Sequence, residues 1–168
     1  MSYDWDGPVT VDEMYGEWDY EAAKAALERS LDPRPGTSIL DTVADVGVGA
    51  DDVVLDIGGR EGQHALMMAE RFGCRAVSVD PVQENIDRGL ELVANSDFGH
   101  RVDLRTGSIE DIPAPDNAFD LVFSRDMMGH VPDLHVAFVE CARVLRSGGA
   151  MVIHEVFGTP LLEPEEKR

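Results

Sequence analysis

The chain contains little cysteine and no long apolar run, and each shortage excludes a class of protein. Only two cysteines occur among 168 residues, Cys74 and Cys141. Two thiols at this spacing form neither a disulfide framework nor a zinc site, so we interpret both as buried and reduced. No segment approaches the roughly 18 consecutive apolar residues of a membrane-spanning helix. No charged and then apolar leader opens the chain, and we therefore expect a cytoplasmic protein.

Positive charge is equally scarce. The chain has 14 Lys and Arg residues against 33 Asp and Glu, a net charge of −19, and its only lysines are Lys24 and Lys167. Such a field repels phosphate backbones and anionic lipid, so we expect neither nucleic acid nor a membrane surface as a partner. An apolar content of 43% nevertheless indicates one folded domain with a substantial core.

The most informative segment, residues 53–81, is typical of one βαβ unit. Residues 53–55 are a β-branched and aliphatic run, as expected of a strand buried on both faces. A turn rich in glycine follows, then apolar residues at helical spacing over 64–72, and then a second strand-like run at 75–79 that ends in Asp80. The unit predicts a parallel sheet with a ligand crevice at the carboxyl ends of its strands.

The spacing of the glycines distinguishes between two kinds of nucleotide-binding motif. A dinucleotide fingerprint needs glycine at the first, third and sixth positions, but Arg60 and Gln63 occupy the third and sixth positions after Gly58. A second pattern has an acid two residues before the first glycine and another glycine at the fifth position. Asp56 and Gly62 meet this pattern. In this the chain resembles the class I S-adenosylmethionine-dependent methyltransferases, whose first motif is Asp-x-Gly-x-Gly-x-Gly.

The resemblance implies a cofactor site along the ends of the strands. Asp80 follows Gly58 by 22 residues, close to the roughly 20 expected for an acid that binds ribose hydroxyls. Arg60 replaces the usual middle glycine and is either a solvated residue, which we favour, or a contact to the cofactor carboxylate. Ser108 replaces the usual acid of the adenine loop, so Ser108, Glu110 or Asp111 would hold the adenine amino group. The predicted cofactor residues are Asp56, Gly58, Gly59, Gly62, Asp80, Pro81, Ser108, Ile109 and Ser124.

Later segments extend the resemblance in order. We predict strands at 101–106 and 150–157, and a turn that leads into a fourth strand over 116–123. We also predict a helix over 37–46 and another that begins after Asp133 and is ended by residues 146–149. The expected fold is α/β, a doubly wound, mostly parallel, Rossmann-like sheet of five strands.

We divide the chain into a helical lid over residues 1–49, a core over 50–158 and a polar tail over 159–168. Class I members normally continue into antiparallel strands, for which we find no segment after the predicted fifth strand of this sequence. We therefore expect either a front part of a longer protein, which we favour, or a second copy or partner chain along the edge of the fifth strand.

The segment from Ser124 to His130 is similar to that of phosphoethanolamine and of sarcosine or dimethylglycine methyltransferases. By that resemblance His130 is the candidate catalytic base, with Tyr15 or Tyr20 of the lid as a partner. Asp126 and Glu155 are alternative contacts for a cationic amine, and we expect no metal. The predicted function is methyl transfer to N or O of a small molecule. The alternative is a noncatalytic S-adenosylmethionine-binding module or partner subunit; a nicotinamide oxidoreductase is disfavoured by the glycine spacing.

Overall fold

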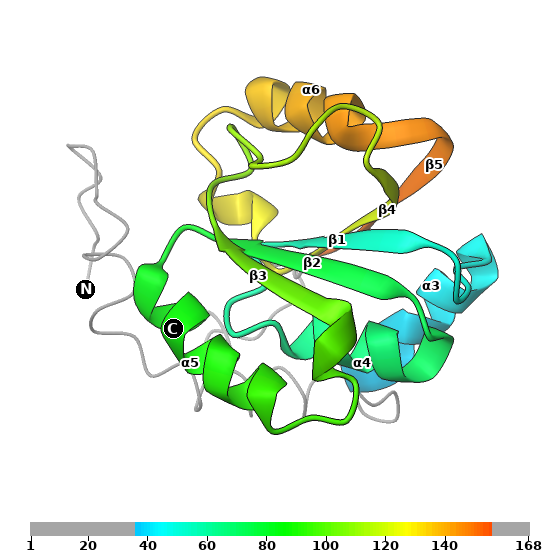
Figure 1. Ribbon diagram of the computed structural model, residues 1–168. Helices are drawn as coiled ribbons and strands as arrows, with labels where there is room; N and C mark the ends of the chain where they lie inside the picture. Colours follow the sequence, from blue (N-terminus) through cyan, green and yellow to red (C-terminus); the bar gives the residue numbers. More distant parts are fainter. Residues whose placement is uncertain (1–35, 156–168) are drawn as a thin grey trace, which may run out of the picture.

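A computed structural model describes residues 36–155 of the chain (Figure 1). The expected lid is therefore described only from residue 36, and its candidate tyrosines, Tyr15 and Tyr20, lie outside the described residues. The expected polar tail, and the last two residues of the predicted fifth strand, lie outside them as well.

A sheet of five parallel strands forms the centre of the molecule, in the order β3-β2-β1-β4-β5. The strands are β1 Val53–Ile57, β2 Arg75–Asp80, β3 Val102–Thr106, β4 Phe119–Arg125 and β5 Leu145–His154. The strand order reverses at β1, which pairs with β2 on one side and β4 on the other. This arrangement confirms the predicted α/β fold and directs ligands to the carboxyl ends of these strands.

Helices cover both faces of the sheet (Figure 1). The helices α3 Ile39–Val46, α4 Gln63–Phe72 and α5 Gln83–Ala94 lie on one face, and α6 Leu134–Val144 lies on the other. Two of the predicted helix ends are confirmed. Gly73 ends α4 at φ +70°, with its N–H donating to the carbonyl of Ala69, and Asp133 begins α6 by accepting hydrogen bonds from the N–H groups of His135 and Val136.

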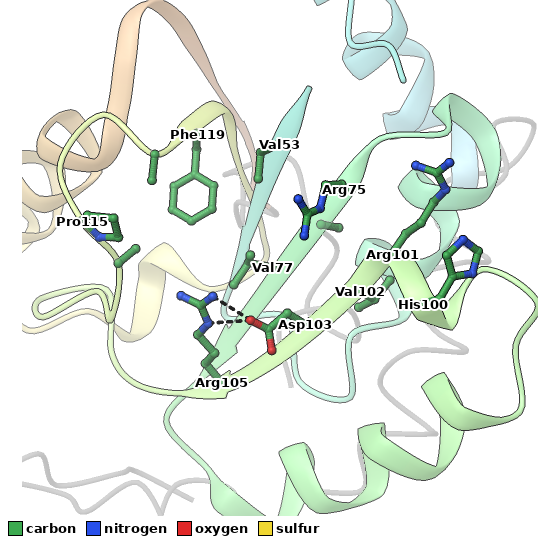
Figure 2. A pocket seen from close by; sticks show the side chains of 13 residues that line it. Val53, Arg75, Val77, His100, Arg101, Val102, Asp103, Arg105, Pro115 and Phe119 are labelled. Carbon is green, nitrogen blue, oxygen red and sulfur yellow. Dashed lines mark hydrogen bonds and ion pairs between the residues drawn. The ribbon is translucent and has the colours of Figure 1, made fainter. Parts of the chain in front are cut away.

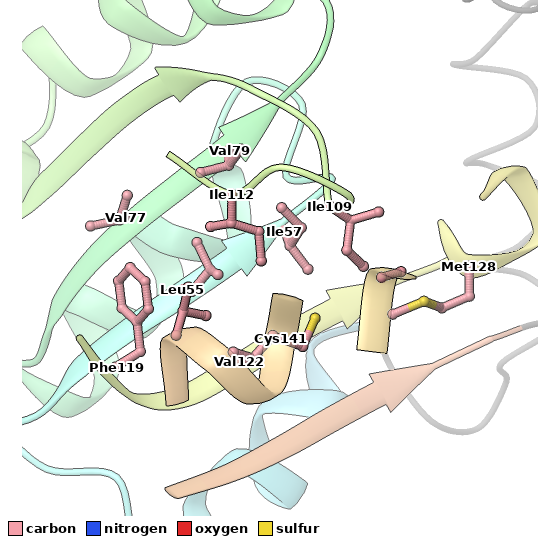
Figure 3. Close-up of a cluster of buried hydrophobic side chains, with 12 residues drawn as sticks. Leu55, Ile57, Val77, Val79, Ile109, Ile112, Phe119, Val122, Met128 and Cys141 are labelled. Atoms are coloured by element: carbon pink, nitrogen blue, oxygen red, sulfur yellow. The ribbon is translucent and has the colours of Figure 1, made fainter. Parts of the chain in front are cut away.

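Alternate residues of the central strands supply two separate cores. Val54 of β1 and Phe123 of β4 pack with Leu40, Val43 and Met68 beneath α3 and α4. The opposite face, shown in Figure 3, joins residues of the strands to those of the loop after β3 and of α6: Leu55, Ile57, Val77, Val79, Ile109, Ile112, Val122 and Cys141. Burial of each such side chain stabilises the fold by roughly 1.5–3 kcal/mol, so the strand ends are held on a rigid platform.

The two cysteines match their predicted state. Cys74 and Cys141 are both free and buried, and burial raises the pKa of each thiol to about 11. Thiols of that kind are almost wholly protonated at neutral pH and are poor nucleophiles. Among residues 36–155 no helix is both long and apolar enough to cross a membrane.

The structure differs from the sequence-based expectation at two elements. Helix α5 was not assigned, and β5 begins at Leu145 rather than at residue 150. The early start arises from an irregularity in pairing: Leu145 pairs with Phe119, but the next pair is Ala150 with Leu121. Residues 146–149 therefore form a bulge opposite Asp120, with Gly148 at φ +86°, where the sequence predicted the end of the preceding helix.

Candidate cofactor site at the carboxyl ends of the strands

The glycine turn after β1 folds across the end of β2. The N–H groups of Gly58 and Gly59 both donate to the carbonyl of Val79, at 2.8 and 3.3 Å. Gly58 and Gly62 have φ values of +71° and +77°, which side chains disfavour. A Cβ on Gly58 would also overlap the side chain of Met127, and a Cβ on Gly59 would overlap Ser78. The turn thus requires glycine for space as well as for conformation.

Arg60 adopts a glycine-like backbone without being glycine. Its φ is +51°, in the left-handed region, and its N–H donates to Oδ2 of Asp80 at 3.0 Å. Its guanidinium lies 3.6 Å from the carboxylate of Glu61. The backbone at this position therefore conforms to the pattern that the family usually obtains with glycine.

The side chain of Asp80 is buried, and most acceptor positions of its carboxylate are taken by donors of the protein. Its Oδ1 accepts hydrogen bonds from the N–H of Val82 at 3.0 Å and from Nδ2 of Asn85 at 2.9 Å, and its Oδ2 accepts the one from Arg60. An ionised carboxylate offers about four acceptor positions, so one remains, at Oδ2. The carboxylate is thus fixed in place, with room for one further donor.

Asp56 lies beneath the turn rather than on its surface. It is buried, accepts a hydrogen bond from Oγ of Ser78 at 3.2 Å, and accepts another from the N–H of Ala65 in the first turn of α4. Burial raises its pKa from 3.8 to about 7; these two hydrogen bonds oppose the rise, and the charge of Asp80 adds to it. Its contacts are those of a support for the turn and α4, and contact with a cofactor stays a prediction.

The loop after β3 is anchored beside Asp80. The N–H of Gly107 donates to the carbonyl of Asp80 at 3.1 Å, and Ile109 is buried in the core. Ser108 is half-buried and bridges to Asp111, whose N–H donates to its carbonyl at 3.3 Å. The side chain of Ile109 thus fixes the loop, which leaves Ser108 beside the crevice. Pro81, at the start of the next connection, is exposed.

Charged and polar groups gather at the ends of β4 and β5. Arg125 lies with Nη1 3.0 Å from Nε2 of His64 and with Nε 3.2 Å from Oδ2 of Asp126. The other oxygen of Asp126 lies 3.4 Å from Nδ1 of His154. Asp126 is a second non-glycine residue with φ +51°. Such backbone conformations are uncommon and concentrate at functional sites.

Glu155 holds the loop that carries His130. Its Oε1 accepts hydrogen bonds from the N–H groups of Met127 at 2.9 Å and Met128 at 2.6 Å. The N–H of His130 in turn donates to the carbonyl of Met127 at 3.0 Å, and His130 itself is exposed. Because Met127 also packs on Gly58, the structure brings this loop against the glycine turn.

Ser124 lies inside this edge. It is fully buried in β4, between Ile57 and Ile153 in register, and its Oγ forms no hydrogen bond with the residues that the structure describes. A buried hydroxyl without a partner is costly and fits a site that a ligand completes.

Sequence reasoning did not select Asn85 and Ser78, which hold Asp80 and Asp56. The available signals were the polar Ser78 inside an apolar strand and the amide of Asn85 in the first turn of α5, five residues after Asp80. Apart from Asp56, which lies beneath the turn, the residues predicted for the cofactor lie along one edge of the sheet. Glycines without room for a Cβ, the remaining acceptor of Asp80 and the Oγ of Ser124 fit a ligand that carries hydroxyl and amino groups.

Comparison with known proteins gives a consistent result. Residues 55–153 match a family model described as a methyltransferase domain. The sarcosine/dimethylglycine N-methyltransferase of Halorhodospira halochloris is 32% identical over 105 residues, which are 62% of this chain and 38% of that protein. The 27-O-demethylrifamycin SV methyltransferase of Amycolatopsis mediterranei is 27% identical over 157 residues, 89% of this chain and 55% of that protein.

Solved structures show the same likeness. A putative sarcosine dimethylglycine methyltransferase from Galdieria sulphuraria is 29% identical, with a TM-score of 0.66 over 68% of this chain and 43% of that one. A geranyl diphosphate methyltransferase in complex with sinefungin is 25% identical, with a TM-score of 0.65 over 71% of this chain and 44% of that one.

The chain spans about two fifths to just over half of the length of these four relatives. The matched segment runs from β1 nearly to the end of β5, and so it contains both the glycine turn and Asp80. The glycine turn, the strand order and the family match together show that the chain belongs to the methyltransferase domain family, the class I S-adenosylmethionine-dependent methyltransferases.

Proposed function

We propose that the protein transfers a methyl group from S-adenosylmethionine to N or O of a small molecule. The observation that carries the proposal is the packing of Met127 on Gly58, which joins the loop of His130 to the glycine turn. A site for methyl transfer needs the cofactor and the acceptor side by side, and little more. In this proposal one edge of the sheet would hold both.

The proposed cofactor contacts follow from the groups that remain available. Oδ2 of Asp80 would accept one ribose hydroxyl, and the turn from Gly58 to Gly62 would pass beside the methionine portion. Ser108 and the backbone of Ile109 would contact adenine, and the unpartnered Oγ of Ser124 would face the bound ligand. The bound cofactor supplies an electrophilic methyl group at this edge.

His130 is the proposed proton acceptor. Imidazole exchanges protons near neutral pH, and His130 is exposed on a loop that Glu155 fixes through the two preceding methionines. Removing a proton from the acceptor would increase its nucleophilicity at the moment of transfer. The part of the expected lid that precedes residue 36, with Tyr15 or Tyr20, is proposed to cover the same edge, whereas α3 at its end packs on the sheet.

The acceptor is proposed only as far as its chemical class. The names of the similar proteins include N-methyltransferases and a methyltransferase of a 27-O-demethyl compound, which supports N or O without choosing between them. A noncatalytic S-adenosylmethionine-binding module or partner subunit remains the second candidate. Arg60 in place of glycine and Ser108 in place of an acid favour that candidate.

Calorimetric titration with S-adenosylmethionine, S-adenosylhomocysteine and NAD tests the cofactor. We expect saturable binding of the first two and no response to the third; binding of NAD instead would contradict the proposal.

A screen for methyl transfer to small amines and hydroxyl compounds then separates enzyme from module. His130→Ala should lower the rate by a factor of about 10² to 10⁴ while cofactor affinity stays unchanged. His135→Ala, an exposed histidine on α6, is the matched control. Cofactor binding without turnover of any acceptor would favour the noncatalytic module.

A further inference from the structure

A hollow lies at the opposite end of the sheet from the glycine turn. It has a volume of about 290 Å³ and is lined at the amino ends of the strands, where Val53 begins β1, Arg75 begins β2 and Val102 begins β3 (Figure 2). Phe119 and the loop before β4 form another wall. None of the predicted cofactor residues lines it.

The charge of this hollow opposes that of the chain. Three of the 14 Lys and Arg residues, Arg75, Arg101 and Arg105, line it together with His100, and Asp103 is the one acid among its lining residues. In a chain with a net charge of −19, this clustering creates a local positive region in a negative surrounding field.

Arg75 has the most available hydrogen-bond donors among the cations that line the hollow. Its side chain is exposed and forms no hydrogen bond or ion pair with any residue from 36 to 155. Figure 2 shows its guanidinium reaching from the start of β2 toward β1, on the side where Val53 and Val77 lie. All five N–H donors of this guanidinium are therefore available in a fixed, planar arrangement.

The neighbouring arginines are held in place by the protein. Arg105 donates from Nε and Nη2 to Oδ2 of Asp103, at 2.9 and 2.6 Å, and from Nη1 to the carbonyl of Pro113 at 2.9 Å. Arg101 donates from Nη1 to the carbonyl of Gly73 at 2.7 Å. Asp103 balances one charge, so the three arginines and this acid leave an excess of two positive charges.

We infer that this hollow binds a small organic anion, with its carboxylate or phosphate group on Arg75 and its apolar part against Val53 and Val77. Guanidinium groups pair bidentately with either kind of anion, and the two valines and Phe119 provide an apolar surface beside them. The volume lies at the lower end of that of ligand sites, which fits one ring or a short chain. This site does not depend on the proposed methyl transfer.

Titration of ¹⁵N-labelled protein at low salt tests the inference, with phenyl phosphate and benzoate as probes. Inorganic phosphate and phenol serve as controls for the charge alone and for the ring alone. We expect saturable shifts at the amides of Val53, Arg75 and Val102, and little change at Gly58 and Asp80. The preferred probe tells which anionic group the site takes. Shifts centred on Gly58, or no saturation with either probe, would overturn the inference.

Substitutions separate this site from general attraction of anions. Arg75→Gln should weaken binding of the preferred probe about tenfold or more, because a charge-assisted bidentate contact is lost. Arg88→Gln, an exposed arginine on α5 across the sheet, should leave binding unchanged. Asp103→Asn should strengthen binding, because Arg105 then loses its counter-charge. Equal effects of Arg75→Gln and Arg88→Gln, in variants shown to be folded by circular dichroism, would contradict the assignment.

Discussion

The backbone N–H of Arg60 donates a hydrogen bond to Oδ2 of Asp80 across 3.0 Å. This bond ties the glycine turn after β1 to the acid at the end of β2. It depends on the left-handed backbone of Arg60, at φ +51°, and not on its side chain. The two principal elements of the proposed cofactor site are therefore fixed relative to one another before any ligand binds.

The first prediction concerns the side chain of Arg60. Arg60→Gly should leave the affinity for S-adenosylhomocysteine unchanged or slightly raised, because glycine adopts this backbone conformation without strain. Calorimetry at low and high salt measures the effect. Arg60→Ala removes the same charge but keeps the unfavourable φ, and it separates charge from conformation. A loss of affinity in both variants that is larger at low salt would show that the guanidinium binds the cofactor carboxylate.

The second prediction concerns Asp80. Asp80→Ala should weaken binding of S-adenosylhomocysteine by roughly 1.5–3 kcal/mol, the scale of a hydrogen bond to a charged group. The same change frees Asn85 and Val82, so the free energy of unfolding must be measured alongside. Asn85→Ala disturbs the same support without removing the acceptor, and it should cost less affinity. Unchanged affinity in Asp80→Ala would remove the ribose contact from this position.

The third prediction concerns Gly58. Gly58→Val should abolish cofactor binding, because its side chain would overlap Met127 and its φ of +71° is strained for valine. Gly129→Ala is a matched control in the adjacent loop, since a Cβ there meets no atom within 4 Å. Titration of both variants with S-adenosylhomocysteine should show loss of binding in the first only. Full affinity in Gly58→Val would exclude the turn from the site.

The fourth prediction concerns stability and pH. The pKa of Asp56 is raised to about 7 by burial, whereas aspartate in an unfolded chain titrates near 3.9. Between these values the folded state keeps a proton that the unfolded state has released. The contribution of Asp56 to the free energy of unfolding is therefore complete below about pH 4, and it is lost as pH rises through about 7.

Denaturant unfolding from pH 4 to 8 measures this slope. Asp56→Asn removes the titrating proton and should flatten the fall in stability between pH 4 and 7. Asp51→Asn, which removes an exposed carboxylate before β1, is the control and should retain the slope. If the slope persists in Asp56→Asn, another group carries it.

The fifth prediction concerns the edge strand β5. Within residues 36–155, β5 pairs only with β4, and Ile153 on it is 41% exposed. An open edge with exposed apolar residues favours pairing with another chain. Where no further residues of the chain cover this edge, the protein should self-associate or recruit a partner along β5, and Ile153→Lys should shift sedimentation toward the monomer. Glu70→Lys, with an exposed carboxylate on α4, controls for charge. A monomeric wild type whose β5 amides are protected from exchange would contradict this prediction.

The parts of the fold that follow from neighbouring residues could be predicted from the sequence. The βαβ unit, the cap at Asp133 and the end of α4 at Gly73 each depend on a few consecutive residues. Helix α5 was not assigned, and Gly89 in its middle weakens the helical signal. The structure explains that glycine, because a Cβ there would lie 2.7 Å from the carbonyl of Glu61 in the turn.

Much of the candidate site depends on contacts between distant segments. Glu155 lies 28 residues from Met127, and no local pattern indicates that its carboxylate binds the backbone of the loop before His130. The hollow lined by Arg75, Arg101 and Arg105 likewise brings together the starts of four strands. Such contacts depend on the strand order and on the register of the strands. The sequence predicts the fold class, but it does not predict the register.

Met127 connects the glycine turn to the loop that carries His130. Its thioether side chain rests on Gly58, so an occupant of the turn must either move this side chain or lie along it. Methionine yields easily, because it is unbranched and has three rotatable bonds. Its backbone, however, is attached to Glu155 and followed closely by His130. A ligand at the turn that moves Met127 would therefore also move the loop that carries His130, the proposed proton acceptor.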